Sequence, residues 1–165
     1  MNFMTANYLI RTLYSPESSL SISFFKANLS LSFCPQSTGN YRRENKRYLS
    51  TTISDDTAAV LLTFCHSILR GELTSLRYPI ECNNQTYLYF ECIANDVGSQ
   101  QQVVLVIRKN RDQIPFTFKI SECRILKNGR EQVEYIQSGL IIFTKVLEAY
   151  LTAIANERLF SDNEY

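Results

Sequence analysis

The chain has 165 residues, of which 45% are hydrophobic and 20% charged, and its formal net charge is +1. This length suits one globular domain with a sizeable core or two small, intimately packed halves, and the composition excludes an intrinsically disordered chain. There is no run of about 18 to 20 consecutive apolar residues, so the sequence predicts no membrane span.

The distribution of charge is more informative than its sum. Residues 1–130 carry 15 Lys and Arg against 10 Asp and Glu, whereas residues 131–165 carry 2 against 6. The larger, basic part of the chain can therefore offer a surface to an anion, and the acidic end would repel one.

The cysteines indicate the compartment. Their number is odd and no two are spaced as a CxxC pair: Cys34, Cys65, Cys82, Cys92 and Cys123. This pattern favours reduced thiols in an intracellular protein, over either a disulfide framework or a zinc site.

The first strands are expected after an N-terminal extension, residues 1–19. This extension has no acidic residue before Glu17 and carries Arg11, as a transit peptide would, but an ordinary N-terminal helix or strand is the favoured interpretation. From residue 20 to 33, apolar residues alternate with serine on both sides of a short break, which predicts a half-buried antiparallel hairpin. Residues 47–54 predict a third strand.

A helix should follow directly. Ser54 or Asp55 can cap its N-terminus. Gly71 lies just after the expected last turn, where helices often end with a residue in the left-handed backbone conformation. Apolar residues recur at helical spacing and predict one buried stripe, formed by Leu61, Phe64, Cys65 and Ile68.

The second half repeats this plan. Further strands are expected at residues 76–81, 86–93, 102–109 and 114–126. Asn128-Gly129 then predicts a tight hairpin turn into a strand over 131–137. A second helix should run from Ser138 to about residue 158. The sequence therefore predicts an α+β domain over 20–158, built of two successive antiparallel-strands-then-helix units, with an acidic tail at 159–165.

The second helix is apolar on more than one side. Four residues cannot all share the stripe of Leu147 and Leu151: Ile141, Ile142, Phe143 and Val146. A helix with apolar residues on two sides commonly packs against its own sheet on one side and against another protomer on the other, so we expect a homo-oligomer.

Sequence motifs for catalysis are missing. The only histidine, His66, follows Cys65 in the first predicted helix, where adjacent side chains point about 100° apart and cannot form a nucleophile–base pair. We find no phosphate-binding loop, hydrolase motif or metal-ligand spacing. The sequence therefore predicts a protein that is not an enzyme and that needs no metal or cofactor.

The stretch "YRRENKRY" (41–48) places four cations between two tyrosines. It follows a strand ending in Phe33-x-Pro35 and precedes a strand with Leu49-Ser50 and an acid-capped helix. This order resembles the first half of the Whirly family of single-stranded DNA-binding proteins. There, a strand ending in Phe-Ala-Pro leads through a Tyr-Asp-Trp loop and an Arg-Lys pair into a Ser-Leu-Ser-Val strand and a helix.

The resemblance is coarse and covers residues 20–158, including the C-terminal helix. The Lys-Gly-Lys-Ala-Ala-Leu motif of plant Whirly proteins is absent. The wider superfamily, with positive cofactor 4 and the kinetoplastid guide-RNA-binding proteins, shares the architecture with little common sequence. The resemblance implies a non-enzymatic binder of single-stranded DNA, or else RNA, that assembles as an oligomer.

Such a binder pairs cations for the phosphates with rings on which bases stack. The rings would be Tyr41, Tyr48, Tyr87 and Tyr89. The cations would be Arg42, Arg43, Lys46, Arg47, Arg77, Arg108 and Lys119. Leu88 and Phe90 should face the core, and Ser30 and Ser32 should keep the outer face polar. The alternative is a solvated loop in a protein–protein interaction or assembly module of a virus or organelle.

Overall fold

The computed structural model describes residues 8–25, 27–36, 48–72, 80–82, 85–93 and 100–162. Antiparallel sheets combine with two helices in this part of the chain, so the expected α+β class is confirmed. The first half is β1 (Tyr8–Tyr14), β2 (Ser18–Phe25), β3 (Asn28–Pro35), β4 (Leu49–Ile53) and α1 (Asp55–Leu69). The second half is β5 (Ile80–Glu81), β6 (Thr86–Ile93), β7 (Gln102–Lys109), β8 (Asp112–Thr117), β9 (Ser121–Lys127), β10 (Arg130–Ile136) and α2 (Ser138–Asp162).

The first four strands form one antiparallel sheet in the order β1-β2-β3-β4. Alternate residues of β2 and β3 are almost completely buried: Leu20, Ile22, Phe24, Leu29, Leu31 and Phe33. The serines between them, among them Ser30 and Ser32, lie half-buried on the opposite face. The predicted half-buried hairpin is therefore confirmed.

The sheet extends into the expected N-terminal extension, because β1 pairs with β2 along its length. The domain boundary consequently lies before residue 20. The β1–β2 ladder slips between Leu9 and Arg11. Such a bulge interrupts the two-residue period by which strands are recognised in a sequence.

Helix α1 forms as its sequence predicts. Ser54 is the N-cap, and its side chain accepts a 3.4 Å hydrogen bond from the backbone N–H of Thr57. The buried stripe consists of Ala58, Leu61, Cys65 and Ile68, and Phe64 is half-buried beside it. Gly71 has a φ of 73°, the left-handed conformation expected after the last turn.

The second sheet has the order β5-β6-β7-β8, and β6 and β7 match their predicted ranges. The expected continuous strand over 114–126 is wrong, since it consists of β8 and β9 in different sheets. Phe118 is buried and still bonds to Val103 through a 2.9 Å N–H···O contact, whereas the chain beyond Lys119 leaves this sheet. Of the expected strand 76–81, only residues 80 and 81 are described.

Helix α2 begins at Ser138, as predicted, and it continues into the expected tail as far as Asp162. Gly139 allows its close approach to the chain after β8, because a Cβ there would lie 2.6 Å from the backbone nitrogen of Lys119. Phe143 shares the buried stripe of Leu147, whereas Ile141 remains exposed.

Contrary to the sequence-based expectation, the first twenty residues of α2 are long and apolar enough to cross a membrane. Leu140, Phe143 and Leu147 are fully buried in this domain, however, and the core helix of a globular domain has the same composition. Core packing therefore accounts for part of the apolar character of α2, since 39% of its most apolar window is buried.

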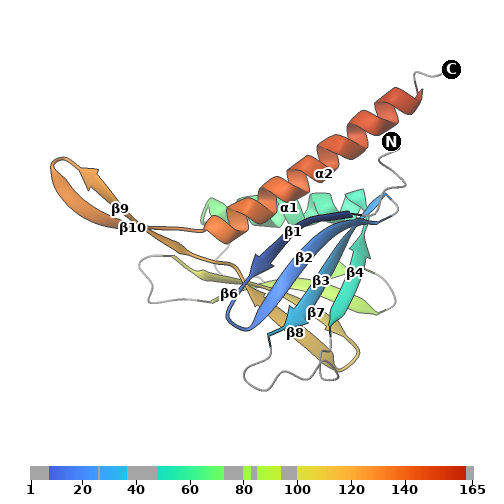
Figure 1. Cartoon of the computed structure of the whole chain (residues 1–165), viewed down its shortest axis with the longest axis horizontal. Coiled ribbons are helices and arrows are strands. Elements are labelled where there is room, and N and C mark those ends of the chain that lie inside the picture. Colours follow the sequence, from blue (N-terminus) through green and yellow to red (C-terminus); the bar gives the residue numbers. More distant parts are fainter. Residues whose placement is uncertain are drawn as a thin grey trace.

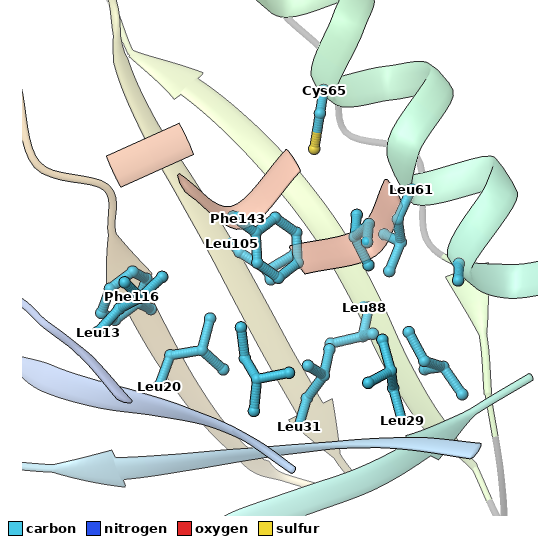
Figure 2. Packing of buried hydrophobic residues seen from close by; sticks show 14 of the residues in the cluster. Leu13, Leu20, Leu29, Leu31, Leu61, Cys65, Leu88, Leu105, Phe116 and Phe143 are labelled. Carbon is cyan, nitrogen blue, oxygen red and sulfur yellow. The ribbon is translucent and has the colours of Figure 1, made fainter. Parts of the chain in front are cut away.

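The core lies between the two sheets and the two helices. Figure 1 shows the helices together along one side of the sheets, and α1 packs against α2. Figure 2 shows Leu61 and Cys65 of α1 and Phe143 of α2 directed toward residues from both sheets, such as Leu31 and Leu88. Both sheets therefore keep one face toward the core.

Candidate nucleic-acid interface

The outer face of the second sheet carries two tyrosines on β6. Leu88 and Phe90 point into the core and are 0% and 1% exposed. Because side chains alternate along a strand, Tyr87 and Tyr89 lie on the opposite face, where both are half-buried. The predicted register of this strand is confirmed.

Arg108 lies beside Tyr87 on the neighbouring strand β7. The two residues are directly opposite each other in the ladder, and the Arg108 Cζ atom is 5.2 Å from the centroid of the Tyr87 ring. A guanidinium over an aromatic ring at an exposed site is favourable by about 0.5–1 kcal/mol. The contact keeps a positive charge and a ring next to each other on the outer face.

An apolar row lies beside this pair. Tyr89 is opposite Val106 of β7, which in turn is opposite Pro115 of β8. Val106 is buried although it belongs to the outer register, and Pro115 is exposed. One row further along, Glu91 lies opposite Val104. The face therefore changes from cationic at Arg108, through apolar, to acidic at Glu91.

Strand β8 joins this face to the first sheet. The Ser18 hydroxyl donates a 2.6 Å hydrogen bond to the Pro115 carbonyl, and the Thr117 hydroxyl donates one of 3.0 Å to the Glu17 carboxylate. The backbone N–H of Gln36 donates to the Glu17 carbonyl at 2.9 Å. Gln36 is the last described residue before the predicted basic loop, so the chain enters that segment close to β8.

Six of the predicted site residues lie outside the described residues: Tyr41, Arg42, Arg43, Lys46, Arg47 and Arg77. Tyr48 is described and is 65% exposed just before β4. It is separated by two and four residues from Ser50 and Thr52, whose side chains alternate with the buried ones of β4. Tyr48 therefore belongs to the outer face of the first sheet.

Lys119 is exposed but is not brought together with Arg108. It follows Phe118, which bonds to Val103, whereas Arg108 lies five residues further along β7 opposite Gln113. At about 3.3 Å per strand residue this separation is about 17 Å. Lys119 and Arg108 therefore lie near opposite ends of the sheet.

Two adjoining hollows surround Lys119, with volumes of about 440 and 450 Å³. Both are also lined by Tyr14, whose side chain is 68% exposed, and one of them is lined by Arg11. Arg11 and Tyr14 were not predicted as site residues, because β1 was not expected as a strand of the sheet. The sequence signal that could have identified them is the presence of an arginine and a tyrosine in an otherwise apolar N-terminal stretch.

The thiol and imidazole of α1 do not form a reactive pair. Burial raises the pKa of the Cys65 thiol to about 12, so this thiol stays protonated at neutral pH. His66 points elsewhere, with its Nε2 atom 3.3 Å from an Oε1 atom of Glu148 on α2. The positions of both side chains are explained by the packing of α1, and neither requires a catalytic role.

Among the described residues, no three His, Cys, Asp or Glu side chains are grouped as a metal site. Comparison of the sequence with protein-family models and with curated proteins gives no match. The site must therefore be interpreted from its own chemistry: a ring and a guanidinium in contact, a second ring nearby, and an apolar row on the outer face of the second sheet.

Proposed function

We propose that the protein is a non-enzymatic binder of single-stranded nucleic acid, with DNA as the first candidate and little preference for sequence. The observation that carries this proposal is the contact between Tyr87 and Arg108, with Tyr89 on the same outer face. Leu88 and Phe90 of the same strand point into the core, so these groups face outward from it.

A single strand exposes phosphates and unstacked bases at the same time. Aromatic rings on an open sheet can stack bases of any sequence, with about 1–3 kcal/mol lost per base when the ring is removed. Arg108 supplies a charge for the adjacent phosphate. The apolar row from Tyr89 to Pro115 would exclude water beneath the bound bases.

The order of elements supports a Whirly-like fold. Four antiparallel strands precede α1, and four more, β5 to β8, precede the hairpin β9–β10 and α2. We further propose that the chain is a divergent member of this group, with the hairpin as an elaboration.

Fluorescence anisotropy with labelled oligonucleotides tests the function. Single-stranded DNA, single-stranded RNA and duplex DNA of one sequence are titrated from about 50 to 200 mM salt. We expect tighter binding of a single strand than of the duplex, little change when the sequence is permuted, and affinity that falls with salt. Absence of binding at low salt would contradict the proposal and favour the protein–protein module.

A further inference from the structure

The hairpin β9–β10 projects away from the rest of the domain (Figure 1). Its strands form a separate two-stranded sheet with an uninterrupted ladder from Lys127↔Arg130 to Ser121↔Ile136. Within the described chain, the main contacts of each strand are with the other. A two-stranded hairpin without further support is only marginally stable in water.

The hairpin also exposes apolar side chains and open edges. Its exposed apolar residues are Ile125, Leu126, Val133 and Ile136, of which Leu126 is 78% exposed. Proteins protect edge strands with proline, bulges, charged side chains or a covering segment. Strand β10 contains no proline and its ladder has no bulge, but it carries Arg130, Glu131 and Glu134, so its outer edge is suited to a strand of complementary charge.

The turn determines which backbone groups face that edge. Asn128 and Gly129 have φ values of 53° and 74°, as in the tight two-residue turns that close hairpins. Lys127 and Arg130 flank this turn and exchange backbone hydrogen bonds. Because the pattern alternates, the N–H and C=O groups of Glu131, Val133 and Tyr135 point away from β9.

We propose that β10 pairs antiparallel with β10 of a second copy of this chain, about a twofold axis at Gln132. In this register Arg130 lies opposite the partner subunit's Glu134, and the symmetry repeats the pair. Glu131 lies opposite the partner subunit's Val133. The two hairpins then form one four-stranded sheet, and across its new β10–β10 seam opposite charges face each other and no like charges do.

Charge selects β10 over the other edge. Pairing β9 with β9 of a second copy about its midpoint would place Arg124 opposite the partner subunit's Arg124, and like charges directly opposite are destabilising. In the β10 register, Arg130 and Glu134 occupy non-hydrogen-bonded positions, where opposing residues approach most closely. A second copy therefore matches this edge in both backbone pattern and charge.

Charge exchange tests the register. Analytical ultracentrifugation should show a dimer for the unaltered protein and a monomer for Arg130→Glu and for Glu134→Arg. Each substitution would place two like charges opposite each other, at both of the symmetry-related positions in the dimer. The two single variants mixed together should dimerise again, and so should the double variant. Lys127→Glu is the matched control on β9, and it should stay dimeric.

Cross-linking tests the axis. In a Cys123→Ser background, Gln132→Cys should give a disulfide-linked dimer on oxidation, since the two positions would lie about 4.5 Å apart between Cα atoms. Ile125→Cys, opposite Gln132 on β9, should not cross-link. Circular dichroism checks that each variant folds.

A monomeric unaltered protein would overturn the proposal. So would folded single charge variants that remain dimeric with no cross-link at Gln132, which would place the interface elsewhere, for example on α2. Neither result depends on whether the protein binds nucleic acid.

Discussion

The hydroxyl of Tyr150 on α2 donates a 2.8 Å hydrogen bond to the backbone carbonyl of Ala27, in the turn between β2 and β3. Tyr150 is 3% exposed, and its ring packs edge-on against Phe24 with 5.8 Å between centroids. Ala27 has a φ of 66°, which is unfavourable for a residue other than glycine. The contact thus connects the last helix to the first hairpin and supports a strained turn.

Tyr150→Phe should lower the free energy of unfolding by about 1–2 kcal/mol, because the partly buried Ala27 carbonyl loses its donor while the ring is kept. Urea denaturation followed by circular dichroism measures this change. Tyr135→Phe, on the hairpin, is the matched control and should change stability little. Equal stability of the Tyr150 variant and the unaltered protein would show that the hydrogen bond contributes nothing.

Gly139→Ala should destabilise the protein more than Gly71→Ala does. A Cβ at Gly139 would lie 2.6 Å from the Lys119 nitrogen, a backbone atom that cannot move alone, whereas nothing lies within 4 Å of a Cβ at Gly71. The cost at Gly71 comes only from its φ of 73° and should be about 1–2 kcal/mol. Thermal unfolding of both variants, compared side by side, checks the order. The reverse order would mean that α2 does not dock closely on this segment.

Stability should fall as the pH rises above about 9, partly through Cys65. Burial raises the pKa of this thiol from 9.0 to about 12, so between these values the unfolded chain loses a proton that the folded protein keeps. The contribution is fully present below pH 9 and is lost as the pH rises. Comparing urea midpoints at about pH 8 and pH 10, the decrease should be smaller in Cys65→Ala than in the unaltered protein. An equal decrease would contradict this role.

The remaining prediction from sequence alone concerns the basic loop. Replacing Arg42, Arg43, Lys46 and Arg47 with Ala should weaken binding to all oligonucleotides alike. The log–log salt slope should flatten by about 0.7 for each phosphate that the variant no longer neutralises. Anisotropy titrations over a salt series measure both effects. Unchanged affinity and slope would identify the loop as a solvated turn.

Regular periodicity made much of the fold predictable. Leu29, Leu31 and Phe33 alternate with serine, and Leu61, Cys65 and Ile68 follow helical spacing, so the hairpin and α1 were recognised. The break between β8 and β9 was not recognised, because Phe118, Ile120 and other apolar residues continue the strand-like pattern through it. Which of them are buried depends on the tertiary path of the chain, and the pattern does not contain that information.

The candidate site was predictable where it depended on strand register. Alternation placed Tyr87 and Tyr89 on the outer face, and the structure adds the contact with Arg108. The separation of Lys119 from Arg108 was not predictable, since it depends on which ends of β7 and β8 meet. Pairing between strands is a tertiary property and leaves no local signal.

The most direct test of the proposed function is the affinity of Tyr87→Ala and Arg108→Ala for a single-stranded oligonucleotide over a salt series. Tyr87→Ala should weaken binding by about 1–3 kcal/mol and leave the salt slope unchanged, because stacking releases no counterions. Arg108→Ala should lower the slope by about 0.7. Tyr87→Phe keeps the ring and should bind like the unaltered protein, as should Arg124→Ala on the hairpin. Unchanged binding by both site variants, together with loss of binding in Tyr14→Ala or Lys119→Ala, would contradict the account and place the site at the hollows beside β1.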